Sequence, residues 1–188
     1  MIVLASKSPR RRELLTALGY DFTIHTKETD ESLPAGIHPK EGVEILSVRK
    51  AMAVLCDFCD SDYIIASDTL VEIDGEPLGK PIDEADAVRM LMRLSGNPHR
   101  VHSGVAVLHN GKIYSGSDTS TVIFRPFDES EAHAYVKTGE PMDKAGAYGI
   151  QGLGGRLVDK VEGEIDTIVG LPCKLLKKLM AEAENEKE

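Results

Sequence analysis

Short apolar runs alternate along the chain with longer stretches of helical periodicity, and this pattern predicts an α/β fold. The apolar runs indicate strands near residues 2–5, 21–25, 63–73, 76–79, 101–108, 112–115, 119–124 and 156–161. The helical stretches cover residues 9–18, 41–59, 84–94 and 129–136, and Pro172 opens a last helix. Ser8, Asp83 and Asp128 stand where N-caps are expected. We find no repeat or linker, so residues 1–188 are expected to form a single domain.

Two turn signals and one glycine-rich segment separate these elements. Asp74-Gly75 and Asn110-Gly111 each lie between predicted strands and predict tight hairpins. Residues 139–155 contain six glycines in seventeen positions. Long glycine loops within a compact domain are often functional, so this segment is a candidate for ligand recognition.

Composition limits the classes of partner. The 22 Lys and Arg against 31 Asp and Glu give a net charge of −9, which would not attract nucleic acid, so any anion site must be a local basic pocket.

Three cysteines do not form a disulfide framework, and the apolar residues directly after Met1 do not resemble a signal peptide, so a cytoplasmic location is expected. No apolar run approaches the ~20 residues that cross a bilayer, so no membrane partner is expected. Cys56 and Cys59 have redox spacing, but their place at the end of a predicted helix favours ordinary burial.

Basic side chains gather at the start of the first predicted helix, in Ser6-Lys7-Ser8-Pro9-Arg10-Arg11-Arg12. A helix N-terminus carries partial positive charge, so four cations there are unfavourable unless an anion binds. A polyanion such as a phosphate chain could be bound here by backbone N–H groups, Ser hydroxyls and guanidinium groups together. The alternative is an N-cap followed by solvated arginines, and the residues alone leave both open.

Asp68 lies in an otherwise apolar strand, where an unpaired carboxylate would cost several kcal/mol. It could hold a divalent metal, pair with a cation, or take a proton from an attacking water; backbone N–H groups in a bulge are the alternative. Lys80 follows the second strand of the predicted hairpin, and its ammonium group could approach Asp68 on the first strand. Glu31 and Lys50, considered alone, suggest a solvated loop carboxylate and a helix-surface lysine.

The chain resembles the Maf family, also called septum-formation-inhibitor-like proteins, which are nucleoside triphosphate pyrophosphatases. The resemblance begins at residues 5–11 and continues in the same order through the acidic segment around Glu31 and residues 49–51, 67–69, 79–81, 94–96, 143–152 and 169–172. It implies an α/β fold with an elongated mixed central sheet, flanking helices and a deep cleft between two lobes, related to inosine triphosphate pyrophosphatases.

The resemblance also implies roles for individual residues. Asp68, Glu31 and Lys80 are the expected catalytic residues, with Asp68 as the proton acceptor and with Glu31 and Asp68 as ligands of Mg²⁺ or Mn²⁺. The expected phosphate-binding residues are Ser6, Arg10, Arg11, Lys50 and Lys80. Substrate preference is expected to depend on Arg10, Thr69 and Gln151, a set similar to the subgroup that acts on dTTP and UTP. A glutamine amide can pair with the O4 and N3–H edge of thymine or uracil.

Other functions and assemblies are open at this point. The second candidate is the subgroup that acts on 7-methyl-GTP or other modified nucleotides. A different class of answer is a nucleotide-binding regulator of cell division with little turnover. A nucleoside triphosphate is the expected partner, and a homodimer is a further possibility to test.

Overall fold

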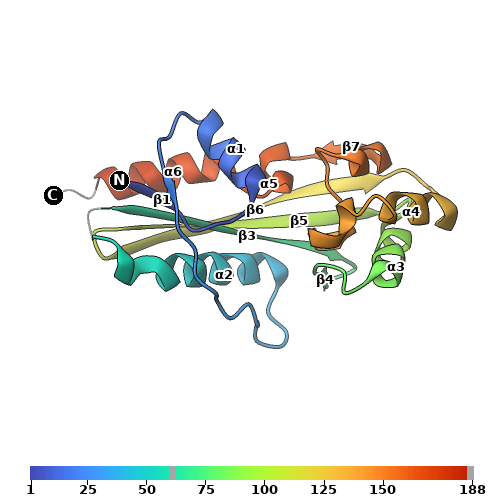
Figure 1. Ribbon diagram of the computed structural model, residues 1–188, viewed down its shortest axis with the longest axis horizontal. Helices are drawn as coiled ribbons and strands as arrows, with labels where there is room; N and C mark the ends of the chain where they lie inside the picture. Colours follow the sequence, from blue (N-terminus) through green and yellow to red (C-terminus); the bar gives the residue numbers. More distant parts are fainter. Residues whose placement is uncertain (60–61, 186–188) are drawn as a thin grey trace. The chain divides into compact units, whose positions relative to one another are not determined.

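Seven strands form one mixed β-sheet in the part of the chain that the computed structural model describes, residues 1–59 and 62–185 (Figure 1). The strands are β1 (Ile2–Leu4), β2 (Thr23–Ile24), β3 (Tyr63–Ile73), β4 (Glu76–Leu78), β5 (Pro98–His109), β6 (Lys112–Phe124) and β7 (Val158–Glu162). The α-helices are α1 (Pro9–Ala17), α2 (Pro39–Val54), α3 (Glu84–Leu94), α4 (Glu129–Val136), α5 (Ile165–Val169) and α6 (Cys173–Asn185). The predicted α/β class is confirmed.

The sheet has the strand order β2-β1-β3-β5-β6-β7, with β4 paired to β3. β1 is parallel to both β2 and β3. The hairpin pair β3 and β4 is antiparallel, and so is the pair β6 and β7. The sheet is therefore mixed, as predicted. Asp74-Gly75 and Asn110-Gly111 form the predicted turns, and all four of these residues have positive φ angles, as tight hairpin turns require.

The chain divides into two compact units, each assembled from separate segments. The first unit contains residues 1–68, 103–118 and 170–188, and the second contains residues 69–102 and 119–169. Strands β3, β5 and β6 each contribute to both units. The single domain over residues 1–188 and the cleft between two lobes stay predictions.

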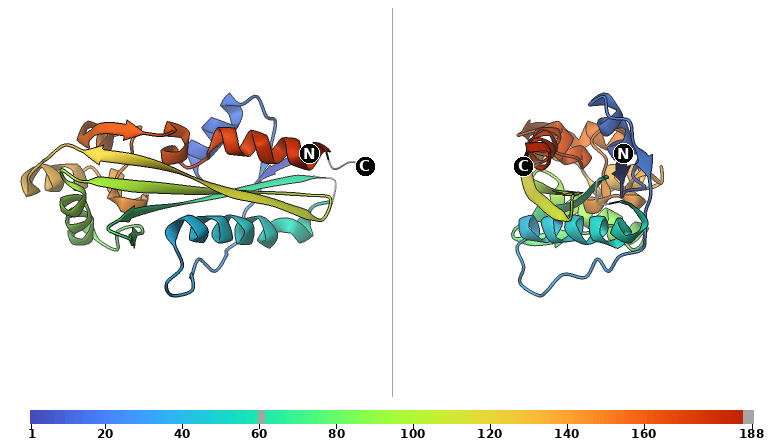
Figure 2. Two further views of the ribbon diagram at one scale, coloured as in Figure 1. Left: turned by 180° about the vertical axis from the view of Figure 1, so that it is seen from behind. Right: turned by 90° about the vertical axis from the view of Figure 1, so that its left-hand side faces the viewer.

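In the first unit, the two faces of the strands are covered by different helices. Ile64 packs in one buried cluster with Ala51 of α2, whereas Ile65 packs in another with Leu15 of α1 and Leu176 of α6. Figures 1 and 2 show α2 along one face and α1 and α6 on the opposite face. Because side chains alternate along a strand, even-numbered residues of β3 in this unit face α2.

Helix α2 lies directly against β5 at Gly104. A Cβ atom on Gly104 would lie only 2.3 Å from the Val43 carbonyl oxygen, so no larger residue fits without moving the helix. The Ser47 hydroxyl donates to the same carbonyl at 2.6 Å. This close backbone approach fixes the position of α2, the helix that carries Lys50.

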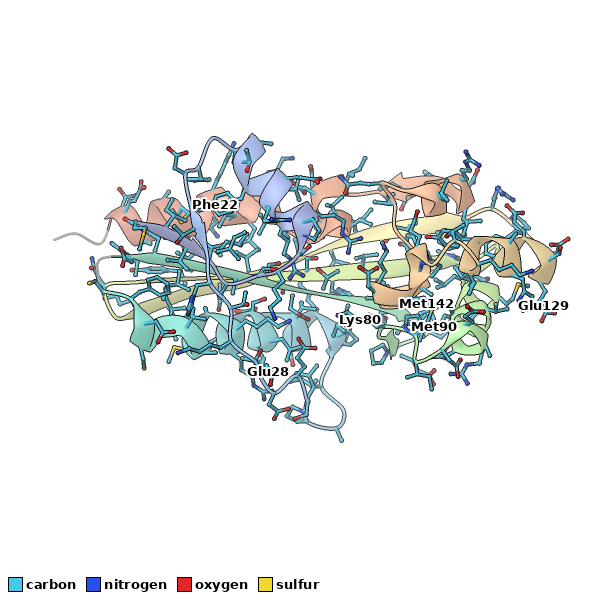
Figure 3. All side chains as sticks on the ribbon, in the orientation of Figure 1. Phe22, Glu28, Lys80, Met90, Glu129 and Met142 are labelled. Carbon is cyan, nitrogen blue, oxygen red and sulfur yellow. The ribbon has the colours of Figure 1, made fainter. Side chains whose placement is uncertain are left out.

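The second unit has its own core between its helices and strands. Met90 of α3 and Met142 of the 3₁₀ turn Glu140–Asp143 both pack against this core, and Figure 3 labels both side chains. His99 lies inside it, with Nε2 2.9 Å from the Tyr148 hydroxyl and its ring edge-to-face with Phe124. Burial lowers the pKa of His99 to about 4, so the ring is neutral at physiological pH and serves packing.

The structure corrects several predicted elements. Residues 112–115 and 119–124 belong to one strand, β6, which continues through Gly116. A Cβ atom there would lie 3.2 Å from Leu175 Cδ1, so glycine allows α6 to pack on the strand without breaking it. Helix α2 begins at Pro39, two residues earlier than predicted, because His38 Nδ1 accepts a hydrogen bond from the Lys40 amide. Helix α5 was not predicted.

The predicted helix over residues 41–59 also ends early. α2 stops at Val54 and a 3₁₀ turn covers Leu55–Asp57. Cys56 and Cys59 are exposed, so the expected burial of this pair was wrong. Both cysteines lie beyond the end of α2, Cys56 within the 3₁₀ turn and Cys59 after it, and no residue of that turn is buried. Every helix within the described residues is either too short or too polar to span a bilayer.

Candidate active site

A buried carboxylate and a loop carboxylate share one ammonium group in the first unit. Asp68 is 8% exposed and, as an even-numbered residue of β3, lies on the face that α2 covers. Lys50 of α2 forms an ion pair with Asp68 Oδ1, and its Nζ lies 2.8 Å from Glu31 Oε1. The cation that a buried carboxylate requires is therefore Lys50. The view of Lys50 as a solvated surface lysine was wrong, since its side chain is 18% exposed.

The loop that carries Glu31 is held against α2 by the neighbouring Arg49. Arg49 Nη1 donates to the carbonyl oxygens of Asp30 at 3.1 Å and Ser32 at 2.6 Å, one on each side of Glu31. The Asp30 carboxylate accepts from the backbone and hydroxyl of Ser32, and these bonds lower the pKa of Asp30. Glu31 itself is 61% exposed in its side chain, so it faces solvent while its backbone is fixed. Sequence reasoning gave Arg49 no role, and no local pattern signals one.

Arg11 is half-buried and joins the start of α1 to the segment before α6. Its Nε donates to the Gly170 carbonyl at 2.8 Å, and its Nη1 donates to Ser6 Oγ at 3.1 Å. The Ser67 hydroxyl donates to the same Gly170 carbonyl at 2.7 Å. Burial lowers the pKa of Arg11, and the charge of Asp68 is the strongest influence in the opposite direction. The guanidinium therefore lies in the electrostatic field of the carboxylate cluster.

The other members of the basic segment differ in burial. Ser6 is 7% exposed, and its hydroxyl accepts from Arg11 and from the Ser8 amide at 3.3 Å. A hydroxyl that accepts two hydrogen bonds still has one proton to donate to an anionic oxygen. Arg10 is half-buried and Arg12 is exposed. The solvated-arginine interpretation therefore fits Arg12 and is wrong for Arg11.

Three predicted site residues belong to the second unit. Thr69 follows Asp68 in β3 and is half-buried. Lys80 is exposed two residues after β4, and Figure 3 labels it. Gln151 is exposed in the glycine-rich segment. Their arrangement around Glu31, Lys50 and Asp68 stays a prediction.

The residues present can be tested for their fit to a divalent metal. Within residues 1–59 and 62–185, no group of three or more His, Cys, Asp or Glu side chains is arranged to hold an ion. Glu31 and Asp68, however, each have a carboxylate oxygen in contact with the same Lys50 ammonium, so the two carboxylates are close together. Mg²⁺ is commonly bound by one or two carboxylates together with water and substrate phosphates, so this oxygen pair fits such an ion.

Comparison with known proteins gives consistent results over nearly the whole chain. A family model described as Maf-like protein matches residues 1–183. A dTTP/UTP pyrophosphatase of Vibrio cholerae is 47% identical over 171 residues, covering 91% of each chain. A dTTP/UTP pyrophosphatase of Bacillus velezensis is 46% identical and covers 91% of this chain and 90% of its own. A dTTP/UTP pyrophosphatase of Thermococcus gammatolerans is 45% identical and covers 95% of each chain.

Among solved structures, the Staphylococcus aureus Ham1 protein matches with a TM-score of 0.52. The match covers 99% of both chains at 15% sequence identity. At this identity the likeness concerns the fold alone, and it agrees with the mixed sheet and flanking helices described above.

Proposed function

The chain belongs to the Maf-like protein family, and from this membership and its carboxylate cluster we propose that it hydrolyses dTTP and UTP to the nucleoside monophosphate and pyrophosphate. The observation that carries the proposal is the Lys50 ammonium shared by Asp68 and Glu31, in the same unit as Arg11, whose guanidinium is held by the Gly170 carbonyl and Ser6. This arrangement supplies a carboxylate for an attacking water and cations for a phosphate chain. The names of the curated relatives favour dTTP and UTP over 7-methyl-GTP.

In the proposed reaction, water attacks the α-phosphorus of the triphosphate. The bond from the α-phosphorus to the oxygen that bridges to the β-phosphorus breaks, and pyrophosphate leaves with that electron pair. Asp68 accepts the proton of the attacking water, and Lys50 holds this carboxylate in position. Negative charge grows on the bridging and leaving oxygens, and positioned cations stabilise it directly. The residues proposed for this stabilisation are Ser6, Arg10, Arg11, Lys50 and Lys80.

A divalent cation, Mg²⁺ or Mn²⁺, forms part of the proposal, with Glu31 and Asp68 as its protein ligands. When bound, such an ion supplies positive charge to phosphate oxygens and lowers the pKa of a bound water. Lys80 is proposed as a further catalytic group that binds the phosphates. Arg10, Thr69 and Gln151 are proposed to set base preference.

The cellular setting is proposed on a separate observation. Within the described residues, Cys56, Cys59 and Cys173 form no disulfide, which is typical of proteins in a reducing compartment and supports the cytoplasm. A homodimer stays a prediction, which light scattering of the purified protein would test.

The proposed function predicts metal-dependent release of pyrophosphate from dTTP and UTP. The full chain is assayed against canonical and modified nucleoside triphosphates with Mg²⁺ or Mn²⁺, and we expect EDTA to abolish turnover. Release from methylated nucleotides alone would keep the chemistry and overturn the substrate assignment. Nucleotide binding without release from any substrate would favour the regulatory interpretation instead.

Gln151→Ala is expected to raise KM for dTTP and UTP by about tenfold, the cost of one or two lost hydrogen bonds to the base. KM for dATP and dGTP should change little, because their base edges do not present the same pattern. Leu153→Ala, two residues along the same loop and 43% exposed in the native chain, is the matched control and should leave all four values near wild type. An equal rise in KM for every nucleotide would contradict base reading by Gln151.

A further inference from the structure

Gln151 stands on a tight turn of the glycine-rich segment in the second unit. The Gly152 amide donates to the Gly149 carbonyl at 3.3 Å, so Ile150 and Gln151 form the two corners of a four-residue turn. Gln151 is exposed at this corner. Whatever fixes Gly149 and the residues after Gly152 therefore fixes the direction from which Gln151 meets a ligand.

Such fixation matters because an amide alone cannot distinguish thymine from cytosine. Thymine and uracil offer an O4 acceptor, whereas cytosine offers an N4 amino donor at the same place. A glutamine amide carries one acceptor and one donor group, and rotation by half a turn exchanges them. A freely moving Gln151 could match either base. Selectivity is therefore expected to require that the amide approaches the base edge from one fixed backbone position, from which its two orientations do not fit equally well.

The carboxylate of Glu140 holds the segment directly after Gln151. Its Oε2 accepts from the Leu153 amide at 2.9 Å, and its Oε1 accepts from the Gly154 amide at 3.1 Å and from the Tyr135 hydroxyl at 2.8 Å. The Tyr135 oxygen in turn accepts from the Gly149 amide at 3.2 Å. Both ends of the turn are thus tied to one pair of side chains.

The protonation state of Glu140 suits an acceptor of three hydrogen bonds. Burial alone would raise its pKa, but the hydrogen bonds from Leu153, Gly154 and Tyr135, together with the positive charge of Lys144, outweigh burial, so its pKa lies below the ordinary value. The carboxylate is therefore ionised at neutral pH, the form in which it accepts all three bonds.

Two glycines of the segment make room for this carboxylate and its partner. A Cβ atom on Gly152 would lie 2.5 Å from both Glu140 carboxylate oxygens. One on Gly154 would lie 2.4 Å from the Tyr135 hydroxyl oxygen. The high glycine content thus lets an acidic side chain enter a loop that would otherwise exclude it.

We propose that Glu140 is a positioning residue for base selection, which clamps the turn so that Gln151 presents its amide to thymine or uracil and not to cytosine. The inference rests on the proposed function and deepens it. Tyr135 extends the clamp to the other end of the turn.

The test compares kcat/KM for dTTP with kcat/KM for dCTP. In Glu140→Gln, the side-chain amide has one acceptor oxygen where the carboxylate has two, so one or more of the three bonds must be lost. We expect the dTTP preference to fall by about tenfold, through KM more than kcat. Tyr135→Phe should lower it in the same direction. Glu129→Ala on α4, whose native side chain is 72% exposed, is the control and should leave the ratio unchanged (Figure 3).

A double variant separates positioning from general destabilisation. If Glu140 acts through Gln151, Glu140→Gln should not lower the dTTP preference further in a Gln151→Ala background. An unchanged preference in Glu140→Gln, or an equal additional loss in both backgrounds, would overturn the inference.

Failure of the proposed function can be distinguished from failure of the Glu140 inference. If the wild-type protein releases no pyrophosphate, the same variants are compared by calorimetric affinity for dTTP and dCTP without turnover. A dTTP-to-dCTP affinity ratio that falls in Glu140→Gln would then support the clamp, and an unchanged ratio would refute it.

Discussion

Replacing Asp68 by Asn is expected to lower kcat for dTTP by about 10²-fold or more, the usual scale for loss of a general base. The amide has nearly the same shape as the carboxylate and keeps an oxygen that can accept from Lys50, so the fold should survive. It cannot take a proton from water at neutral pH. Pyrophosphate release under saturating dTTP, together with thermal unfolding, measures the two effects separately.

A second Asp→Asn change provides the control for this prediction. Asp128 is the N-cap of α4 and accepts from the Glu131 amide at 2.9 Å, a role that Asn fills equally well. Asp128→Asn should therefore keep both kcat and the unfolding temperature. Near-normal turnover in Asp68→Asn would remove Asp68 from the role of proton acceptor, and unfolding of that variant would show that its charge is needed for stability instead.

Much of the fold is predictable because strands and helices leave local signals. Strand β3 has the predicted bounds, residues 63–73, because its apolar side chains are buried on both faces. Asp83 predicts the start of α3, since its side chain accepts from the Asp86 amide in the structure. These signals depend on residues within a few positions of one another, and a single sequence displays them directly.

The elements that sequence missed depend on distant neighbours. Gly116 resembles a break in a strand until Leu175 of α6 is placed against it. Helix α5 has five residues, too few for helical periodicity to stand out. For β6 the tertiary contact decides the structure, whereas α5 is too short to leave a local signal, and local propensity gives only a weak preference in both.

The candidate site also combines residues with a local sequence signal and residues whose partners depend on tertiary packing. Asp68 could be selected from the sequence because a carboxylate in an apolar strand needs a partner. The identity of that partner could not, since Lys50 on a helix looks like an ordinary surface lysine until α2 is packed against β3. Glu140 gave no signal either, because its partners are amides thirteen and fourteen residues away. Charge placement identifies candidates, and packing assigns their partners.

Arg11 offers the other large expected effect, because one guanidinium holds two parts of the first unit together. Its Nε and Nη1 reach the Gly170 carbonyl and Ser6 Oγ at the same time, and the Gly170 carbonyl also accepts from Ser67. A lysine ammonium is a compact point charge without this fixed fork of donors, so it cannot keep both contacts in place. Arg11→Lys therefore preserves the charge and removes the geometry.

We expect Arg11→Lys to lower kcat/KM for dTTP by about 10²-fold and the free energy of unfolding by about 1–3 kcal/mol, through lost charge-assisted bonds to Gly170 and Ser6. Arg12→Lys is the matched control on the same helix; Arg12 is exposed, so its unfolding free energy should change by less than about 0.5 kcal/mol. Steady-state kinetics and urea unfolding measure both quantities. A less stable Arg11→Lys protein with unchanged kcat/KM would make Arg11 a structural residue, because a phosphate-binding guanidinium must affect substrate as well as fold.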